Sequence, residues 1–548
     1  MHGLMQYHPL LVSSLLKHAA RYHGNTEIVS KRVEGDIHRY TYAEAERRTK
    51  RLVRALQRLG VKESDRVATL AWNGYRHFEI YYAASGMGAV VHTVNPRLHE
   101  SDISYIINHA GSTPVFADIT FAPLIEKIAP GLAGQVRDYV FMSDEANMPP
   151  LELPGGVRVH CYESLVAESV EDYEWPLLDE GSASGLCYTS GTTGRPKGVV
   201  YSHRSTVLHA YAVSTADAFG LRAIDRVMPI VPMFHVNAWG VPYAAPLNGA
   251  AIVFPGRHLD GASLASLFNA EGVTMALGVP TVWMGLLQHM QRTGERLETE
   301  PRILTGGSAC PPMLLETFTK EYGLKVCHAW GMTEISPVGT CDAPKPAHLG
   351  ESPEAEMRRK LKQGRALAGI DLKIVSDAGE ELPWDGKAFG DLKVRGSWVA
   401  SGYFGGQPGS ALDEEGWFTT GDVCTIDPEG YMQITDRSKD VVKSGGEWIS
   451  SIQLENIAVS HPDVAEAAVI AARHPKWDER PLLILLPKPG HTVNPQAVLK
   501  VYEGKVSKWW LPDAVVVVAE MPHTATGKLQ KSVLRERYRD YLTSGGCS

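Results

Sequence analysis

YTSGTTGRPKG, residues 188 to 198, is the most informative stretch of this sequence. Four serine and threonine side chains, three glycines and one lysine fall within its eleven residues. Glycine lets a backbone turn tightly and bring its N–H groups close to an anion, and lysine adds a positive charge. The stretch therefore predicts a cradle for a polyphosphate, formed by Thr189, Ser190, Gly191, Thr192, Thr193, Gly194 and Lys197.

The spacing of this stretch differs from that of a P-loop. A Walker A motif needs Gly-x-x-x-x-Gly-Lys-Ser/Thr, whereas Gly191 and Gly194 are too close together and Gly198 follows the lysine. A run rich in glycine, serine and threonine is often a flexible surface loop. The short apolar runs on either side, residues 186–188 and 199–201, favour instead a phosphate loop between two strands.

Size and composition narrow the class of protein. A chain of 548 residues is too long for one hydrophobic core, so we expect two or more domains. The formal net charge of −8 disfavours a nucleic-acid partner. Seven cysteines without a C-x-x-C pair fit a reduced cytoplasm and offer no zinc site. No apolar run approaches the ~18 residues of a membrane span, and the first residues do not resemble a secretory signal, so we expect a cytoplasmic protein.

The first half of the chain alternates helical and strand patterns. Thr41 with Glu44 is typical of a capping box, and the helix that follows should end at Gly60. A strand at 66–71, a helix at 77–87 and a strand at 89–94 then predict a parallel sheet with helices on its faces. The helix after Thr41 carries a basic face, interpreted as solvated rather than as a site for an acidic partner: Arg47, Arg48, Lys50, Arg51, Arg54 and Arg58.

The second half changes character. Short strands with glycine turns between 372 and 404 predict a small β-rich subdomain, and residues 436–440 form a polar break. The predicted elements after the break form an α+β unit: a helix at 452–459, strands at 465–471 and 481–486, a helix near 497–507 and a strand at 514–518. We therefore expect an α/β protein with an N-terminal domain of residues 1–437, with parallel sheets, helices and the β-rich subdomain, and a small C-terminal domain of residues 438–548.

The stretch at 188–198 resembles the phosphate loop of the adenylate-forming superfamily, which contains acyl-CoA synthetases, luciferases and peptide-synthetase adenylation domains. Further segments match that superfamily in the same order: MFHVNAWG (233–240), TGGSA (305–309), HAWGMTE (328–334), FTTGDV (418–423), DRSKDVVKSGGEWIS (436–450) and PHTATGKLQK (522–531). The resemblance spans essentially the whole chain. The spellings HVNAWG, HAWGMTE and HPKWDERP (474–481) resemble the medium- and long-chain fatty-acyl-CoA synthetase branch, near which the 3-methylthiopropionate ligases lie.

The resemblance implies an ATP and AMP site. Trp330 replaces the more usual tyrosine beside adenine, Thr333 would bond the α-phosphate and Glu334 would ligate Mg²⁺. Lys528 matches the catalytic lysine of the superfamily. The remaining implied nucleotide contacts are the phosphate-loop residues above, with Gly307, Ser308, Ala309, Gly331, Met332, Asp422 and Arg437. Taken alone, Asp422 is equally typical of a turn, and an exposed lysine usually only faces solvent.

The resemblance also implies the rest of the site. His235, Trp239 and Gly306 would line the acyl pocket, although a buried histidine and a core tryptophan remain alternatives. Lys439 would be the hinge of a mobile C-terminal domain. The tunnel for the CoA arm would be formed by Lys443, Ser444, Gly445, Gly446 and Glu447.

The reaction implied is that of an AMP-forming carboxylate–CoA ligase. ATP and a carboxylic acid give an acyl-adenylate and pyrophosphate, and CoA then takes the acyl group after the small domain rotates. The acid would be a fatty acid or a short fatty-like acid such as 3-methylthiopropionate. Alternatives are a luciferase-like oxygenase, an adenylating enzyme with another acyl acceptor, and a binding protein without activity; a homodimer is also left open.

Overall fold

The computed structural model describes residues 1, 3–189, 195–444, 447–523 and 529–543. Within it the chain forms two compact units. Unit 1 comprises Met1–Asp371 and Arg395–Phe418, and unit 2 comprises Leu372–Val394 and Thr419–Ser548. The domain boundary expected between residues 437 and 438 stays a prediction. Among the predicted site residues, Ser190, Gly191, Thr192, Thr193, Gly194, Gly445, Gly446 and Lys528 lie outside the described residues.

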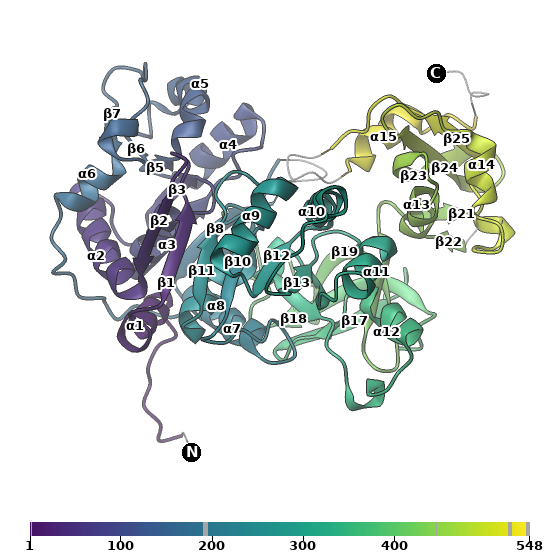
Figure 1. Cartoon of the computed structure of the whole chain (residues 1–548), viewed down its shortest axis with the longest axis horizontal. Coiled ribbons are helices and arrows are strands. Elements are labelled where there is room, and N and C mark those ends of the chain that lie inside the picture. Colours follow the sequence, from purple (N-terminus) through teal and green to yellow (C-terminus); the bar gives the residue numbers. More distant parts are fainter. Residues whose placement is uncertain (2, 190–194, 445–446, 524–528, 544–548) are drawn as a thin grey trace. The chain divides into compact units, whose positions relative to one another are not determined.

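Unit 1 contains two mostly parallel sheets with helices packed on them (Figure 1). The first has the strand order β16-β15-β14-β13-β12-β10-β11-β1-β2 and is parallel from β14 to β1. Its strands are β1 (Glu27–Lys31), β2 (Ile37–Thr41), β10 (Arg226–Pro229), β11 (Ala251–Phe254), β12 (Met275–Gly278), β13 (Arg302–Thr305), β14 (Val326–Gly331), β15 (Val338–Cys341) and β16 (Arg365–Ala366).

The second sheet of unit 1 has the order β7-β6-β5-β3-β4-β8-β9, parallel except for the antiparallel pair β8 and β9. Its central strands are buried along their length, as expected where helices cover both faces of a parallel sheet. The strands are β3 (Arg66–Leu70), β4 (Val90–Thr93), β5 (Val115–Ala117), β6 (Asp138–Phe141), β7 (Arg158–Cys161), β8 (Ala183–Tyr188) and β9 (Gly198–Ser202).

The helices of unit 1 confirm the alternating pattern expected for its first half. The capping box is present at Thr41 and Glu44, and β3, α3 and β4 form the predicted strand–helix–strand unit. No helix in the described part of the chain is long and apolar enough to cross a membrane. The helices are α1 (Val12–Tyr22), α2 (Tyr42–Arg58), α3 (Tyr75–Gly86), α4 (Glu100–Ala110), α5 (Ala122–Leu132), α6 (Tyr162–Ala167), α7 (His203–Ser214), α8 (Val241–Asn248), α9 (Gly261–Glu271), α10 (Pro280–Thr293), α11 (Pro312–Lys320) and α12 (Pro353–Lys360).

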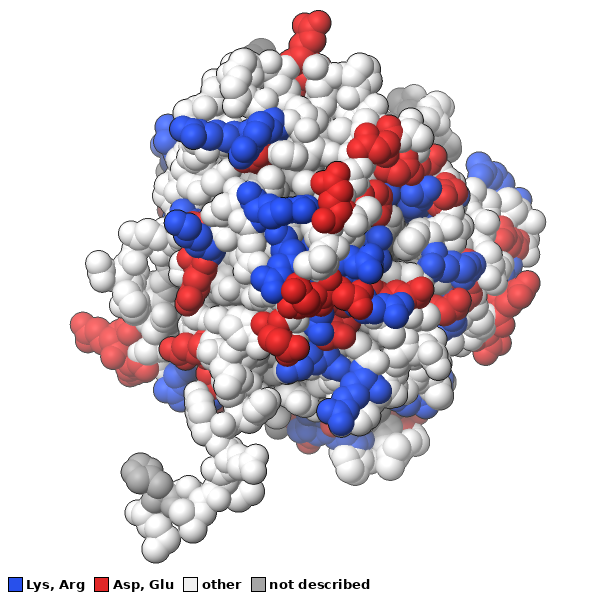
Figure 2. Space-filling view, turned by 90° about the vertical axis from the view of Figure 1, so that its left-hand side faces the viewer, with Lys and Arg blue, Asp and Glu red and all other residues white. Residues whose placement is uncertain are grey.

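The basic face of α2 has acidic neighbours from the same chain. Arg48 pairs with Glu79 at 2.7 Å and with Glu163 at 2.9 Å. Farther along the helix, an ion pair of 3.1 Å joins Arg54 to Asp172. Figure 2 shows blue and red side chains interleaved on the side of the molecule where α2 and α6 lie. These arginines therefore tie α2 to neighbouring segments, and they need no acidic partner molecule to explain them.

Unit 2 holds the predicted β-rich sheet, of order β17-β18-β19-β20. Its strands are β17 (Ile370–Val375), β18 (Phe389–Gly396), β19 (Phe418–Ile426) and β20 (Met432–Arg437), so the first three begin or end in unit 1. The expectation of a small sheet is confirmed, although residues 398–404 form no strand and belong to unit 1.

The last part of unit 2 is the predicted α+β unit. Its sheet has the order β22-β21-β24-β23, with β25 pairing to β24. Apolar clusters cover both sheet faces, one with α13 and α14 and the other with α15. The helix expected near 497–507 ends early, at Lys500, and turns with i→i−3 hydrogen bonds follow it, with Gly504 at a φ of 73°. The elements are β21 (Val442–Ser444), β22 (Glu447–Ile449), α13 (Ser451–Val459), β23 (Val464–His474), β24 (Asp478–Pro487), α14 (Pro495–Lys500), β25 (Ala514–Val517) and α15 (Lys531–Tyr538).

Candidate active site

Predicted site segments follow parallel strands of the first sheet. Residues 233–240 come after β10, residues 306–309 after β13, and residues 330–334 span the end of β14. β10, β12, β13 and β14 are parallel neighbours, so their carboxyl ends lie at one edge of the sheet. Ligands of open α/β sheets bind outside the carboxyl ends of the strands. The fold therefore gathers the segments predicted for adenine, α-phosphate and acyl group at one edge.

The phosphate stretch connects β8 and β9, as the flanking apolar runs predicted. Tyr188 pairs with Gly198, and the N–H of Thr189 donates to the carbonyl of Lys197 over 2.9 Å. The N–H of Phe404 donates to the carbonyl of Gly198 over 2.8 Å. A Cβ on Gly198 would lie only 3.0 Å from the Cβ of Phe404, so this close approach favours glycine. The hairpin that carries the stretch thus packs against residue 404.

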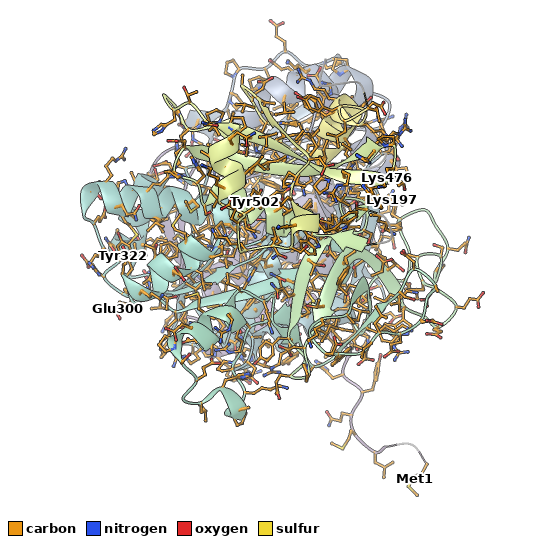
Figure 3. The ribbon with its side chains drawn as sticks, turned by 90° about the vertical axis from the view of Figure 1, so that its right-hand side faces the viewer. Met1, Lys197, Glu300, Tyr322, Lys476 and Tyr502 are labelled. Carbon is orange, nitrogen blue, oxygen red and sulfur yellow. The ribbon has the colours of Figure 1, made fainter. Side chains whose placement is uncertain are left out.

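Tyr403 brings Lys197 and Glu334 to one place. The Nζ of Lys197 (labelled in Figure 3) lies 4.9 Å from the centre of the Tyr403 ring. The hydroxyl of Tyr403 donates to Oε1 of Glu334 over 3.0 Å. Burial, and after it the charge of Glu334, raise the pKa of Tyr403, so its hydroxyl stays protonated. The predicted phosphate lysine and the predicted metal ligand therefore share one tyrosine.

The Thr333–Glu334 pair is held through its backbone. The hydroxyl of Tyr201, on β9, donates to the carbonyl of Thr333 over 2.7 Å. The N–H of Ala400 donates to the carbonyl of Glu334 over 2.7 Å. Thr333 and Glu334 are both buried. Strand β9, which leaves the phosphate stretch, thus fixes the turn predicted to bind the α-phosphate and the metal.

The segment predicted to lie beside adenine is tightly packed. Trp330 is buried, and a Cβ on Gly339 would lie 2.9 Å from Cζ3 of its indole. A Cβ on Gly331 would lie 2.1 Å from the carbonyl oxygen of Pro337, so only glycine fits there. Met332 donates its N–H to the same carbonyl over 3.0 Å. After β13, in contrast, residues 307–309 are exposed, as a surface that receives a ligand should be.

Two of the three predicted acyl-pocket residues, Trp239 and Gly306, are in contact. A Cβ on Gly306 would lie 3.2 Å from Cη2 of Trp239, so the tip of the indole lies against this glycine. Trp239 is buried, in the short turn η3 (Val236–Gly240), whose residues have positive φ. His235 is half-buried and is the N-cap residue of η3.

In unit 2, the two residues predicted to contact ribose form an ion pair. Asp422 of β19 and Arg437 of β20 stand opposite each other in the strand register, and Nε of Arg437 lies 2.7 Å from Oδ1 of Asp422. Asp422 is buried, whereas the Arg437 side chain is 47% exposed. Lys439 follows two residues later, and burial lowers its pKa.

The predicted CoA loop is anchored by an arginine that carried no role in the sequence analysis. Arg480 donates to Ser444 Oγ over 3.3 Å and to the carbonyl of Trp509 over 2.7 Å. It also pairs with Asp513 at 2.7 Å. Lys443, beside Ser444, pairs with Asp377 at 3.0 Å. Of the other predicted members, Glu447 lies in β22, and Gly445 and Gly446 are outside the described residues.

Lys528 also lies outside the described residues, but the helix after it is anchored. Lys531, the first residue of α15, places its Nζ 2.6 Å from Glu455 and 2.6 Å from Ser451 Oγ. Asp436 accepts from the N–H and hydroxyl of Ser451 over 2.5 and 2.9 Å. The start of α15 is thus tied to α13.

Sequence reasoning missed Tyr201, Tyr403 and Arg480. A tyrosine inside an apolar strand needs a partner for its hydroxyl, which is a signal that could have found Tyr201. Tyr403 lies in SGYFGG, which has the composition of a surface turn. Arg480 belongs to HPKWDERP, a stretch that indicated only a resemblance to the fatty-acyl-CoA synthetase branch.

Comparison with known proteins decides the family. Residues 15–404 match the family model described as AMP-binding enzyme, and residues 453–528 match the AMP-binding enzyme C-terminal domain. The chain belongs to the AMP-binding enzyme family. Solved structures with this fold include an anthranilate CoA ligase in complex with anthranoyl-AMP, with a TM-score of 0.84 and 23% identity over 99% of both chains. The o-succinylbenzoate CoA synthetase of Bacillus subtilis, in complex with ATP and magnesium, has a TM-score of 0.78 and 24% identity over 95% of this chain and 99% of its own.

Curated relatives of this AMP-binding enzyme are CoA ligases. The 3-methylmercaptopropionyl-CoA ligase of Ruegeria lacuscaerulensis is 50% identical over 99% of both chains. A medium-chain-fatty-acid–CoA ligase of Ectopseudomonas oleovorans is 48% identical over 100% of this chain and 99% of its own. A long-chain-fatty-acid–CoA ligase of Thermus thermophilus is 45% identical over 96% of this chain and 95% of its own. The predicted activity is confirmed: this AMP-binding enzyme is an AMP-forming acyl-CoA ligase.

Proposed function

We propose that this AMP-binding enzyme activates a fatty acid or a short fatty-like acid such as 3-methylthiopropionate. The observation that carries the proposal is the contact between the buried indole of Trp239 and Gly306, which gives the predicted acyl pocket a bulky apolar wall. An apolar wall suits an alkyl or thioether chain better than a charged acyl group. Relatives 45–50% identical are named for 3-methylmercaptopropionate, medium-chain and long-chain fatty acids, which supports this class.

In the first half-reaction, the carboxylate of the acid attacks the α-phosphate of ATP and pyrophosphate leaves. Lys197 steadies the β- and γ-phosphates, Thr333 bonds the α-phosphate, and Lys528 offsets the charge that develops there. Catalysis of this kind depends mainly on positioning and on charges placed in advance. The shared contact of Lys197 and Glu334 with Tyr403 supports the assignment, because it puts a cation and a carboxylate at one place.

We propose that Glu334 ligates Mg²⁺. No group of three potential metal-ligating side chains is found among the residues that the structure describes. Mg²⁺ is commonly held by one or two carboxylates together with the phosphates of a substrate, so a single buried glutamate fits it. When bound, the ion supplies positive charge to the phosphate oxygens.

In the second half-reaction, the C-terminal segment turns about Lys439, the CoA thiol attacks the acyl carbonyl of the acyl-adenylate, and the acyl–phosphate bond breaks so that AMP leaves and a thioester forms. We assign the CoA arm to Lys443, Ser444, Gly445, Gly446 and Glu447. The hydrogen bond from Arg480 to Ser444 supports this assignment, because it fixes the end of strand β21, which leads into the predicted CoA loop. Asp422 and Arg437 bind ribose hydroxyls through their charged side chains. A cytoplasmic location and a homodimer remain further proposals.

The Lys528→Ala variant tests the proposed division of labour. Adenylation should fall by ~10²- to 10³-fold, as for loss of one preformed charge donor, while thioester formation from supplied acyl-AMP persists. Pyrophosphate release reports the first step, and thioester yield reports the second. A variant that forms acyl-AMP at the normal rate would show that Lys528 is not catalytic. The wild-type protein, assayed with acids from propionate and 3-methylthiopropionate to palmitate, identifies the acid.

A further inference from the structure

The segment that carries Trp239 has an unusual backbone. Val236, Asn237, Ala238 and Trp239 have φ angles of 47°, 52°, 48° and 54°, and Gly240 continues the run at 82°. Residues other than glycine avoid this left-handed region, because the Cβ crowds the following carbonyl. The other non-glycine residues with positive φ in the described part of the chain are isolated: Ser64, Glu300, Ser336 and Asp478. A run of four persists only where its surroundings hold it, and such backbone is concentrated at functional sites.

The approach to this left-handed turn is held by hydrogen bonds. The side chain of Asn73 donates to the carbonyls of Pro229 and Val231 over 2.7 and 2.9 Å. Its Oδ1 accepts the N–H of Met233 over 2.7 Å. The N–H of Ala238 then donates back to the carbonyl of Pro232 over 3.2 Å. These contacts fix the chain that enters the turn, but they do not reach its side chains.

Asn237 ties the turn to two other elements. The hydroxyl of Tyr81, on α3, donates to the carbonyl of Met233 over 2.5 Å and also lies 3.1 Å from Oδ1 of Asn237. The thiol of Cys187, on β8, lies 3.6 Å from the same Oδ1 and 3.0 Å from Oγ1 of Thr93. Asn237, Tyr81 and Cys187 are buried, and burial raises the pKa of Cys187 to about 11, so its thiol keeps its proton. Asparagine also tolerates the left-handed region better than most residues. Asn237 therefore suits this position both by its backbone and by its acceptor.

The turn determines where Trp239 lies. A Cβ on Gly306 would lie 3.2 Å from Cη2 of Trp239, and one on Gly307 would lie 3.9 Å from Cζ2. Relaxation of the left-handed run toward ordinary backbone would rotate Trp239 about the axis of the turn and move the indole from these glycines. The place of the indole thus depends on what holds Asn237.

We propose that Asn237 is a positioning residue for the acyl pocket: through Tyr81 and Cys187 it holds the left-handed turn and keeps Trp239 beside Gly306 and Gly307. The inference rests on the proposed function, because it takes Trp239 as a wall of that pocket. Its consequence is that Asn237, which has no contact with the acyl chain assigned to it, controls which chain lengths are adenylated. Cys187 lies two residues before Thr189, so the same contact links the pocket wall to the strand that enters the phosphate stretch.

The decisive variant is Asn237→Gly, because glycine keeps the left-handed backbone accessible while it removes the side chain that carries the acceptor. We expect the KM of the preferred acid to rise about tenfold, the size of a methylene-scale change in pocket fit, with the ATP KM unchanged within about twofold. The preference among acids of different length should flatten. Asn248→Ala is the matched control, since Asn248 donates to Ser214 and Ala244 away from the turn and should leave both constants unchanged.

A spectroscopic measurement separates positioning from a general structural effect. The protein is labelled with 5-fluorotryptophan, and Trp239→Phe identifies the ¹⁹F resonance of Trp239. In Asn237→Gly this resonance should shift or broaden while the other tryptophan resonances keep their positions. A wild-type acid KM together with an unshifted Trp239 resonance would overturn the proposal.

Two further variants keep the test decisive if Asn237→Gly does not fold. Cys187→Ala removes the thiol beside Asn237, and Tyr81→Phe removes the hydroxyl that contacts both Asn237 and the carbonyl of Met233. Each variant should shift the Trp239 resonance and raise the acid KM by a smaller factor, and Cys187→Ala is the more specific of the two because it leaves the contact with Met233 in place. Wild-type behaviour of both would contradict the proposal. If the wild-type protein activated none of the acids, the proposed function would fail, and the ¹⁹F resonance would still report whether Asn237 positions Trp239.

Discussion

The hydroxyl of Tyr403 donates a hydrogen bond to Oε1 of Glu334 over 3.0 Å, although the two residues are separated by 69 positions in the sequence. The carboxylate is therefore oriented by a residue whose ring also faces Lys197. If Glu334 holds Mg²⁺, its orientation by Tyr403 should affect how tightly the ion binds, because partners of a metal ligand orient that ligand.

Tyr403→Phe removes this hydrogen bond and keeps the ring beside Lys197. We expect the rate of pyrophosphate release at low Mg²⁺ to fall about tenfold, in line with the loss of one hydrogen bond to a charged group, and to recover partly at high Mg²⁺. A titration of the rate against Mg²⁺ measures this. Tyr211→Phe, on an exposed tyrosine of α7, is the control. Identical titrations for Tyr403→Phe and wild type would show that the bond does not serve the metal.

Asp422→Ala should raise the KM of ATP, because a contact with ribose is made in the ground state and transition state alike. It also leaves Arg437 without its ion pair, so the thermal midpoint should be recorded together with the KM. Asp427→Ala gives the contrast, because Asp427 accepts the N–H groups of Glu429 and Tyr431 in the turn between β19 and β20. It should lower the midpoint and spare the ATP KM. An unchanged ATP KM in Asp422→Ala would make Asp422 a structural residue only.

Lys439→Pro should separate the two half-reactions. Proline fixes φ near −65°, so a pivot at this residue would stall the C-terminal segment in one orientation. Pyrophosphate release should survive while acyl-CoA yield falls, and both are measured on the same preparation. Equal retention of both activities would move the hinge away from Lys439, whereas equal loss of both would indicate misfolding.

Acid should destabilise unit 1 through its buried histidines. Burial lowers the pKa of His77 to about 4 and the pKa values of His92 and His209 to about 3. Below the ordinary histidine pKa of about 6.5 the unfolded chain binds these protons first, so the free energy of unfolding decreases as the pH falls from there. Each such histidine contributes up to about 1.4 kcal/mol per pH unit. The thermal midpoint should therefore drop between pH 7 and pH 5; a midpoint that is constant or higher at pH 5 would contradict this.

The fold could be predicted from the sequence where the pattern is local. The capping box at Thr41, the strand–helix–strand unit from 66 to 94 and the loop between β8 and β9 are each encoded by neighbouring residues. The early end of α14 was missed because apolar periodicity continues past the turn at Gly504.

Motifs in the sequence indicate residues of the candidate site, but they do not indicate contacts between distant segments. The sequence indicates Glu334 and Lys197, but Tyr403, which contacts both, follows them in the chain and has no motif of its own. Arg480 reaches Ser444 across 36 positions. The left-handed turn at 236–239 also has no sequence signature, since valine and tryptophan disfavour it and only packing holds it.

The most direct test of the central claim measures the nucleotide product. Purified protein is incubated with ATP, Mg²⁺ and either 3-methylthiopropionate or a medium-chain fatty acid, with and without CoA, and the products are quantified by chromatography and mass spectrometry. With CoA we expect AMP and acyl-CoA in equal amounts, and without CoA a stoichiometric quantity of acyl-AMP bound to the protein. ADP in place of AMP would contradict this mechanism. So would the absence of acyl-AMP from the reaction without CoA when the reaction with CoA does form acyl-CoA.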